Sequence, residues 1–180
     1  MTQQIIKKHY ALTELLESIP INIEGLIRAY GLELDKNADL SEGILGQLKY
    51  QDNNFKILVK RTDHYYRKRF TMAHELGHFL LHKGKMAGNI IDDVNTLSGG
   101  YSAINRDSSI SNKEEVEANN YAAQVLMPKD LLIKYAKDRG AFNSGKLDDE
   151  ALQEIATAFQ VSKAAMKIRI EGLKNEILTN

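Results

Sequence analysis

The segment RFTMAHELGHFLLH, residues 69–82, constrains this chain more than any other part of the sequence. It holds three of the five histidines, His74, His78 and His82, at intervals of four residues. Side chains four residues apart lie on one face of an α-helix, so a helix over about 70–83 carries these imidazoles in a single row. Most other side chains of the segment are apolar, which predicts a buried helix whose polar stripe opens onto a cleft.

His74 and Glu75 begin the pattern His–Glu–x–x–His, which presents two imidazoles from adjacent helical turns to one Zn²⁺ ion. The glutamate lies too far round the helix to bind the same ion. It can instead reach a water molecule beside that ion and act as a general base. The spacing therefore predicts His74 and His78 as metal ligands and Glu75 as the catalytic base.

His82 is a poor candidate for the third ligand. It lies roughly 12 Å beyond His74 along a helix that rises 1.5 Å per residue, whereas zinc–nitrogen bonds are about 2 Å long. A ligand ten positions after His74 is also excluded, because residue 84 is Gly. We predict that His82 packs in the core or contacts a metal-binding residue without binding the ion itself.

The third ligand is expected from the segment EEVEANNYAAQVLMP, residues 114–128. On a helix, Glu115 falls on the small, apolar face that would pack against the histidine helix. Glu117 falls on the polar side and Glu114 lies between the two. A carboxylate on a packed face is costly unless a cation compensates it, so we predict Glu115 as a ligand; the alternative is an exposed helix charge. Asn119, one turn further, is placed to hydrogen-bond the outer nitrogen of a ligating histidine.

The rest of the chain predicts an α+β fold, mainly helical with a small antiparallel sheet. Residues 43–50 and 55–60 read as a β-hairpin around the turn QDNN, and the second strand is a candidate edge strand for an extended substrate. Residues 85–112 are predicted to form a long irregular loop, with a short strand and contacts to substrate. The other segments expected to be helical are about 5–18, 20–30, 113–127, 129–138, 149–159 and 162–178.

Composition excludes several other classes of protein. The 24 basic and 24 acidic residues balance, which argues against broad adhesion to nucleic acid or to an anionic membrane. The chain has no cysteine, so disulfides and thiolate metal sites are excluded. It shows no signal peptide and no apolar run near the roughly 20 residues that span a bilayer, which predicts a cytoplasmic protein.

Several stretches together resemble the ImmA/IrrE family of zinc metallopeptidases, which have gluzincin-type sites. They are RFTMAHELGHFLLH, EVEANNYAAQVLMP, the hairpin that precedes both, and the C-terminal LQEIATAFQVSKAAMKIRIEGL. The resemblance covers about residues 20–175, and the departures, Tyr121 for Phe and Val125 for Leu, are small. It implies a zincin-like domain over 1–145, with 1–19 as a helical extension, and a C-terminal helical pair over 146–180.

Carried over residue by residue, the resemblance implies Zn²⁺ on His74, His78 and Glu115, with Glu75 as the catalytic base. It also implies a cytoplasmic endopeptidase that cleaves a helix-turn-helix repressor of a mobile element or stress regulon. The alternative is a zincin-like module that sequesters a transcriptional regulator without cutting it, although a pure binder has no need of Glu75.

Three questions stay open at this stage. A second donor to the oxyanion can come from Tyr65, Tyr66, His64 or Tyr101. Direct DNA binding by the C-terminal helical pair is disfavoured, because its small and apolar side chains leave little room for base reading. The sequence does not give the oligomeric state, and a His₂Glu site fixes ligand geometry more firmly than the identity of the divalent ion.

Overall fold

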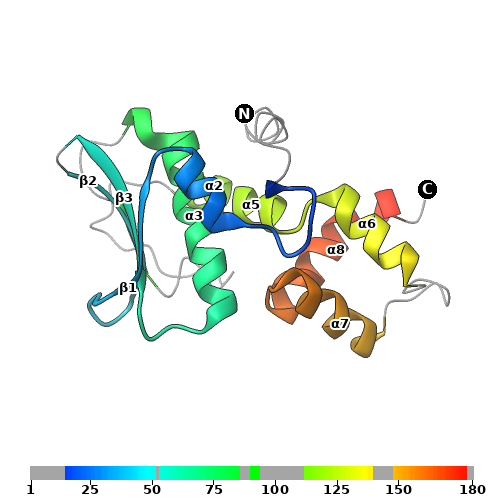
Figure 1. Cartoon of the computed structure of the whole chain (residues 1–180). Helices are drawn as coiled ribbons and strands as arrows, with labels where there is room; N and C mark the ends of the chain where they lie inside the picture. The colour runs from blue at the N-terminus through cyan, green and yellow to red at the C-terminus, as the bar shows by residue number, and fades with distance from the viewer. Residues whose placement is uncertain (1–14, 52, 86–89, 94–111, 140–147, 178–180) are drawn as a thin grey trace.

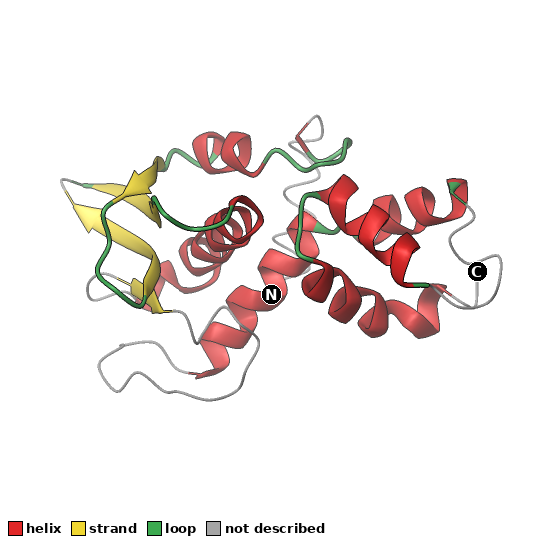
Figure 2. Ribbon diagram, turned by 90° about the horizontal axis from the view of Figure 1, so that it is seen from below, coloured by secondary structure: helices red, strands yellow, loops and turns green. Residues whose placement is uncertain are grey.

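The computed structural model describes residues 15–51, 53–85, 90–93, 112–139 and 148–177. In two perpendicular views, a small sheet and a group of C-terminal helices lie at opposite ends of the molecule (Figures 1 and 2). Helices α3 and α5 lie between them (Figure 1). The elements in chain order are α2 (Ile23–Ala29), β1 (Glu33–Ala38), β2 (Ile44–Gln51), β3 (Asn54–Lys60), α3 (Tyr65–His82), the 3-10 turn η2 (Lys83–Lys85), β4 (Ile90–Asp93), α5 (Asn112–Leu126), α6 (Lys129–Asp138), α7 (Asp149–Phe159) and α8 (Lys163–Ile177).

The predicted α+β class is confirmed, but the sheet is mixed rather than antiparallel. Its strand order is β1-β3-β2-β4. The predicted hairpin is present, since β2 and β3 pair antiparallel with Leu48 opposite Ile57, and β4 pairs antiparallel with β2. Strand β1 pairs parallel with β3. The sequence ELDKNA of β1 has little strand preference of its own, so its state depends on that pairing.

The prediction that residues 55–60 form an edge strand is wrong. Strand β3 lies between β1 and β2 and forms backbone pairs with both. Its side chains alternate in burial, and Ile57 and Val59 are fully buried. Among the described strands, β1 and β4 are the ones with a free edge.

Helix α3 is buried as predicted, but it begins at Tyr65, five residues before the expected start. His64 is its N-cap, and the Nδ1 atom of His64 accepts a hydrogen bond from the backbone N–H of Tyr66 at 3.3 Å. The first turn is polar and half-exposed, so the apolar periodicity that marks the helix starts only at Phe70. Every residue from 71 to 79 is buried.

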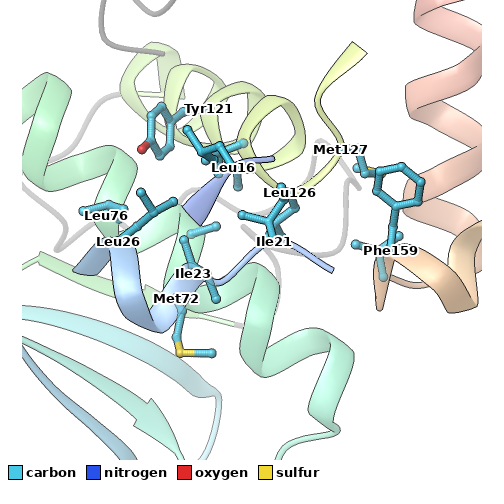
Figure 3. Close-up of a cluster of buried hydrophobic side chains, with 14 of the residues drawn as sticks. Leu16, Ile21, Ile23, Leu26, Met72, Leu76, Tyr121, Leu126, Met127 and Phe159 are labelled. Atoms are coloured by element: carbon cyan, nitrogen blue, oxygen red, sulfur yellow. The ribbon is translucent and has the colours of Figure 1, made fainter. Parts of the chain in front are cut away.

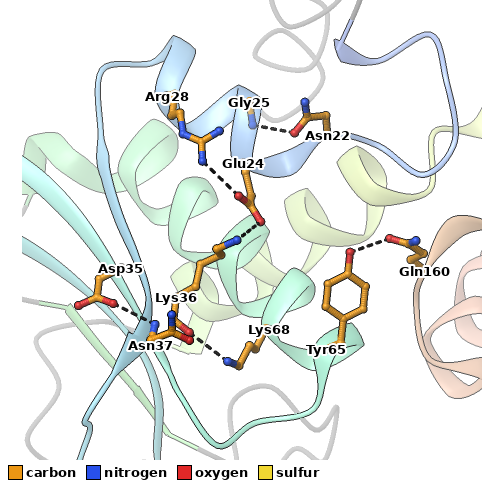
Figure 4. Close-up of polar contacts among 10 residues, drawn as sticks. All are labelled: Asn22, Glu24, Gly25, Arg28, Asp35, Lys36, Asn37, Tyr65, Lys68 and Gln160. Atoms are coloured by element: carbon orange, nitrogen blue, oxygen red, sulfur yellow. Dashed lines mark hydrogen bonds and ion pairs between the residues drawn. The ribbon is translucent and has the colours of Figure 1, made fainter.

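The remaining helices agree with the sequence predictions to within about three residues. Helix α2 starts at Ile23, after an Asn22 cap whose side chain accepts from the backbone of Gly25 at 2.9 Å (Figure 4). Asp148 caps α7 as predicted. Most of the helix expected at 5–18 lies outside the described residues, and the described part, from residue 15, is not α-helical.

One hydrophobic cluster connects the central helices with the C-terminal helices. Leu26, Leu76 and Tyr121 lie toward one end of it, and Met127 lies toward Phe159 of α7 at the other end (Figure 3). The predicted boundary between residues 145 and 146 falls outside the described residues. Within the described ranges, no helix combines the length and the apolar character needed to cross a membrane.

Helices α3 and α5 approach closely because Gly77 has no side chain. A Cβ atom at Gly77 would lie 3.0 Å from Cδ1 of Tyr121 and 3.3 Å from the backbone of Ala118. Both neighbours are completely buried and have little room to move. This close approach brings the carboxylates of α5 within reach of the histidines of α3.

Replacing Gly77 by Val is therefore expected to lower the free energy of unfolding by about 1–3 kcal/mol, the usual cost of overpacking. Chemical denaturation of both proteins measures the difference. Gly172→Val is the matched control, because a Cβ at Gly172 in α8 meets nothing within 4 Å. The control should be neutral or slightly stabilising, and an equal loss in both variants would contradict the close-approach argument.

Candidate metal centre

The histidines of α3 form the row that their spacing predicts. His74 and His78 are fully buried, and their Nε2 atoms lie 2.9 Å apart. The next ring along the helix, His82, is also buried, and its Nδ1 atom lies 3.0 Å from Nδ1 of His78. Two imidazole nitrogens therefore converge on one point between adjacent turns of the helix.

Helix α5 adds a carboxylate to this pair. The Oε2 atom of Glu115 lies 3.4 Å from Nε2 of His74, and its Oε1 atom lies 3.3 Å from Nε2 of His78. The Glu115 side chain is 17% exposed, so it reaches the imidazoles from the packed side of α5. The potential ligand atoms of the three residues all lie within 4.8 Å of one another. The structure thus brings His74, His78 and Glu115 together, as the sequence predicted.

The spacing of these atoms fits a tetrahedral metal ion. Bonds of about 2.0–2.1 Å to nitrogen and oxygen place neighbouring ligand atoms roughly 3.3–3.4 Å apart. The two nitrogen–oxygen separations, one to each oxygen of Glu115, are close to that value, and the nitrogen–nitrogen separation is somewhat shorter. Two imidazoles and one carboxylate are also the donor set that suits Zn²⁺ and related divalent ions. His74, His78 and Glu115 could therefore hold a metal ion.

Asn119 contacts the ring nitrogen of His74 that does not face Glu115. Its Oδ1 atom lies 2.9 Å from Nδ1 of His74, one turn of α5 beyond Glu115. A carbonyl oxygen can only accept, so this contact places the proton of His74 on Nδ1 and leaves the Nε2 lone pair directed at Glu115. The contact expected for Asn119 is present in the structure.

Glu75 occupies a different position from the three candidate ligands. Its side chain is fully buried, and it faces strand β2 at Gly46. A Cβ atom at Gly46 would lie 2.5 Å from Oε1 of Glu75 and would also meet Cγ2 of Thr71. The absence of a side chain at Gly46 thus creates the space that the Glu75 carboxylate fills.

Replacing Gly46 by Ala is expected to displace the Glu75 carboxylate while leaving the three candidate ligands in place. For the general base that the sequence predicts at Glu75, a displacement near 1 Å costs about 10²-fold in rate, so we expect a loss of that order in kcat/KM with little change in metal affinity. Steady-state kinetics and metal titration of the same preparation measure the two effects. Gly84→Ala, where a Cβ meets nothing within 4 Å, is the control; unchanged kinetics in Gly46→Ala would count against this role for the glycine.

Glu117 lies on the more exposed side of α5, as the helical wheel predicted, and its side chain is 40% exposed. It also makes a contact that the wheel did not predict, because its Oε2 atom lies 3.0 Å from Nε2 of His82. Burial lowers the pKa of His82 below its usual value, and the hydrogen bond to Glu117 partly opposes that shift. A helical wheel shows only the direction of the Cβ atom of Glu117, whereas the long side chain bends toward α3 and reaches His82.

The candidate oxyanion donors lie mostly at the start of α3, eight to ten residues before His74. The hydroxyl of Tyr65, which is 52% exposed, donates to Oε1 of Gln160 at 2.9 Å (Figure 4). His64 serves as the helix cap, and its ring packs edge-on against Tyr66. Tyr101 lies outside the described residues. The structure therefore gives the Tyr65 hydroxyl a different partner, and His64 is not part of the group formed by His74, His78 and Glu115.

Among the described residues, Gly46 and the contact of Glu117 with His82 are features around this centre that sequence reasoning missed. A glycine inside a strand often marks a close approach by another group, so GILGQLKY carried a signal for Gly46. The partner of that glycine is nearly 30 residues away, however, and only the folded chain identifies it as Glu75. No local pattern pointed to the contact between Glu117 and His82.

Comparison with known proteins agrees with this geometry. A family model described as the IrrE N-terminal-like domain, of the peptidase M78 family, matches residues 39–171. A search of curated protein sequences finds no match. The matched range contains β2, β3, α3 and α5, and hence all the residues of the candidate centre. The chain therefore belongs to the peptidase M78 family of IrrE N-terminal-like domains.

Proposed function

We propose that this protein is a zinc-dependent endopeptidase that hydrolyses a peptide bond in a regulatory protein. The observation that carries the proposal is the convergence of His74, His78 and Glu115, with Glu75 buried beside them against β2. Membership of a peptidase family supports the reaction class. Zn²⁺ is the ion we assign, because a His₂Glu set on two helices is typical of catalytic zinc.

The roles of the protein's own groups follow from this placement. A bound Zn²⁺ supplies Lewis-acid polarisation of the scissile carbonyl and promotes ionisation of the attacking water. Glu75 accepts a proton from that water as its oxygen bonds to the carbonyl carbon. Glu75 then returns the proton to the leaving nitrogen as the C–N bond breaks, so that one carboxylate serves both half-reactions.

An extended substrate needs a free strand edge near Glu75. Among the described strands, β4 has such an edge and pairs with β2, the strand whose Gly46 faces Glu75. We therefore place the substrate backbone along β4, by addition of a strand to the sheet. This replaces β3, which lies inside the sheet.

The substrate we propose is a helix-turn-helix repressor, cleaved in the cytoplasm, which makes the protein an antirepressor. The resemblance to ImmA/IrrE metallopeptidases supports this substrate class, and the absence of cysteine accords with a reducing compartment. Direct DNA binding does not form part of the proposal. In α8, Lys163 pairs with Asp149 and Arg169 donates to the backbone oxygen of Met127 at 3.1 Å, so both cations have partners within the protein.

A second candidate function is sequestration of the repressor without cleavage. Incubating the zinc-loaded protein with a candidate helix-turn-helix repressor from its own genome separates the two functions. Peptidase function predicts two fragments by mass spectrometry, and their formation should stop when a chelator removes the metal. A stable complex of intact chains, with zinc present, would favour sequestration.

A further inference from the structure

A chain of polar contacts extends outward from the candidate metal centre. The Nδ1 atom of His78 lies 3.0 Å from Nδ1 of His82, and Nε2 of His82 lies 3.0 Å from Oε2 of Glu117. The ring of His82 is 4% exposed, whereas the Glu117 side chain is 40% exposed. The chain thus runs from a fully buried imidazole, through a second buried ring, to a carboxylate at the surface.

With two neutral rings, one arrangement of protons satisfies both the His78–His82 contact and the His82–Glu117 contact. An ionised carboxylate can only accept hydrogen bonds, so His82 donates to Glu117 from Nε2. A neutral imidazole has one N–H, and Nδ1 of His82 is then an acceptor. His78 must therefore donate from Nδ1, which leaves the lone pair of its Nε2 atom facing Glu115.

We propose that His82 and Glu117 are positioning residues that fix the tautomer and orientation of His78 in the metal centre. The proposal deepens the function proposed above and rests on its metal site. A ligating histidine usually donates its second N–H to an acceptor, which orients the ring and increases its basicity. Here the acceptor is itself a histidine, and the charge of Glu117 acts through it.

The two candidate ligands are thereby held in different ways. His74 donates to the neutral amide of Asn119 at 2.9 Å. His78 donates to an imidazole that in turn donates to a carboxylate. A residue that served only to fill the core would need no polar atoms here, because burying an imidazole is costly unless both nitrogens are satisfied. Both nitrogens of His82 have partners in this chain.

Metal affinity measured with three variants tests the proposal. In His82→Leu the acceptor for His78 is lost, and we expect zinc affinity in competition with a chromophoric chelator to fall about 10- to 100-fold, the usual effect of losing an outer partner. In His82→Asn an acceptor oxygen lies near the position of Nδ1, and we expect much of the affinity to return. In Glu117→Ala the affinity should fall in the same direction as in His82→Leu.

The controls separate positioning from folding. Glu171→Gln alters an exposed carboxylate on α8 and should leave zinc affinity unchanged. Thermal unfolding of each metal-free variant identifies any general loss of structure. Wild-type affinity in a folded His82→Leu protein would overturn the proposal while leaving the metal centre intact.

Nitrogen NMR of the wild-type protein gives an independent readout that needs no variant. In the zinc-loaded protein we expect the His82 ring to carry its proton on Nε2 and the His78 ring on Nδ1. A proton on Nδ1 of His82 would overturn the proposed chain of donors. A wild-type protein that bound no zinc would contradict both this proposal and the proposed function. Wild-type zinc affinity in a folded His82→Leu protein would contradict this proposal alone, so the two failures can be told apart.

Discussion

Glu75→Gln is expected to lower the rate of peptide cleavage by orders of magnitude while zinc remains bound. The substitution keeps the size of the side chain, so it still fits the space left by Gly46, but an amide cannot accept the proton of the attacking water. General acid–base catalysis contributes about 10²–10⁴-fold, and we expect kcat/KM to fall by that factor. Fragment formation from the substrate, followed over time at equal zinc occupancy, measures the loss.

The appropriate control makes the same chemical change at an exposed position. Glu171→Gln should retain full activity, because Glu171 lies on the outer face of α8. Metal content must be equal in both variants, since Glu75 is assigned to proton transfer and not to metal binding. Undiminished cleavage by Glu75→Gln would exclude it as the base.

Glu115→Ala is expected to remove most of the metal affinity and, with it, the stabilisation that zinc confers. A ligand that binds only the folded state stabilises it by about 2.7 kcal/mol at a concentration of 100 times Kd. For a chain of this size that corresponds to a rise in Tm of roughly 5–10 °C. The wild-type protein should show this rise on adding zinc, and Glu115→Ala should show almost none at the same concentration.

Thermal unfolding with and without zinc measures this difference directly. Glu171→Ala should keep the wild-type response, because it removes a carboxylate that does not approach the histidines. A full zinc-dependent rise in Glu115→Ala would show that the ion binds elsewhere. Loss of the response in both variants would point to a general effect of charge.

The placement of the candidate ligands could be predicted because each depended on a local helical pattern. The four-residue spacing fixes His74 and His78 on one face, whatever the rest of the fold does. The same reasoning put Glu115 and Asn119 on the packed face of the helix that the structure labels α5, and the structure brings both to the histidines.

The features that were missed depend on contacts between segments distant in the sequence. Strand β1 has few apolar residues and becomes a strand by pairing with β3, more than 20 residues later. The inner position of β3 follows from that same pairing. The start of α3 at Tyr65 was missed because its first turn is polar and its cap is a histidine, a residue with no strong capping preference.

X-ray absorption at the zinc edge, on protein purified with its metal and checked by elemental analysis, tests the central claim most directly. The geometry of His74, His78 and Glu115 predicts about one zinc per chain, with two imidazole nitrogens and carboxylate oxygen near 2.0–2.1 Å. Protein that binds no transition-metal ion, or a zinc shell without imidazole scattering, would contradict the account.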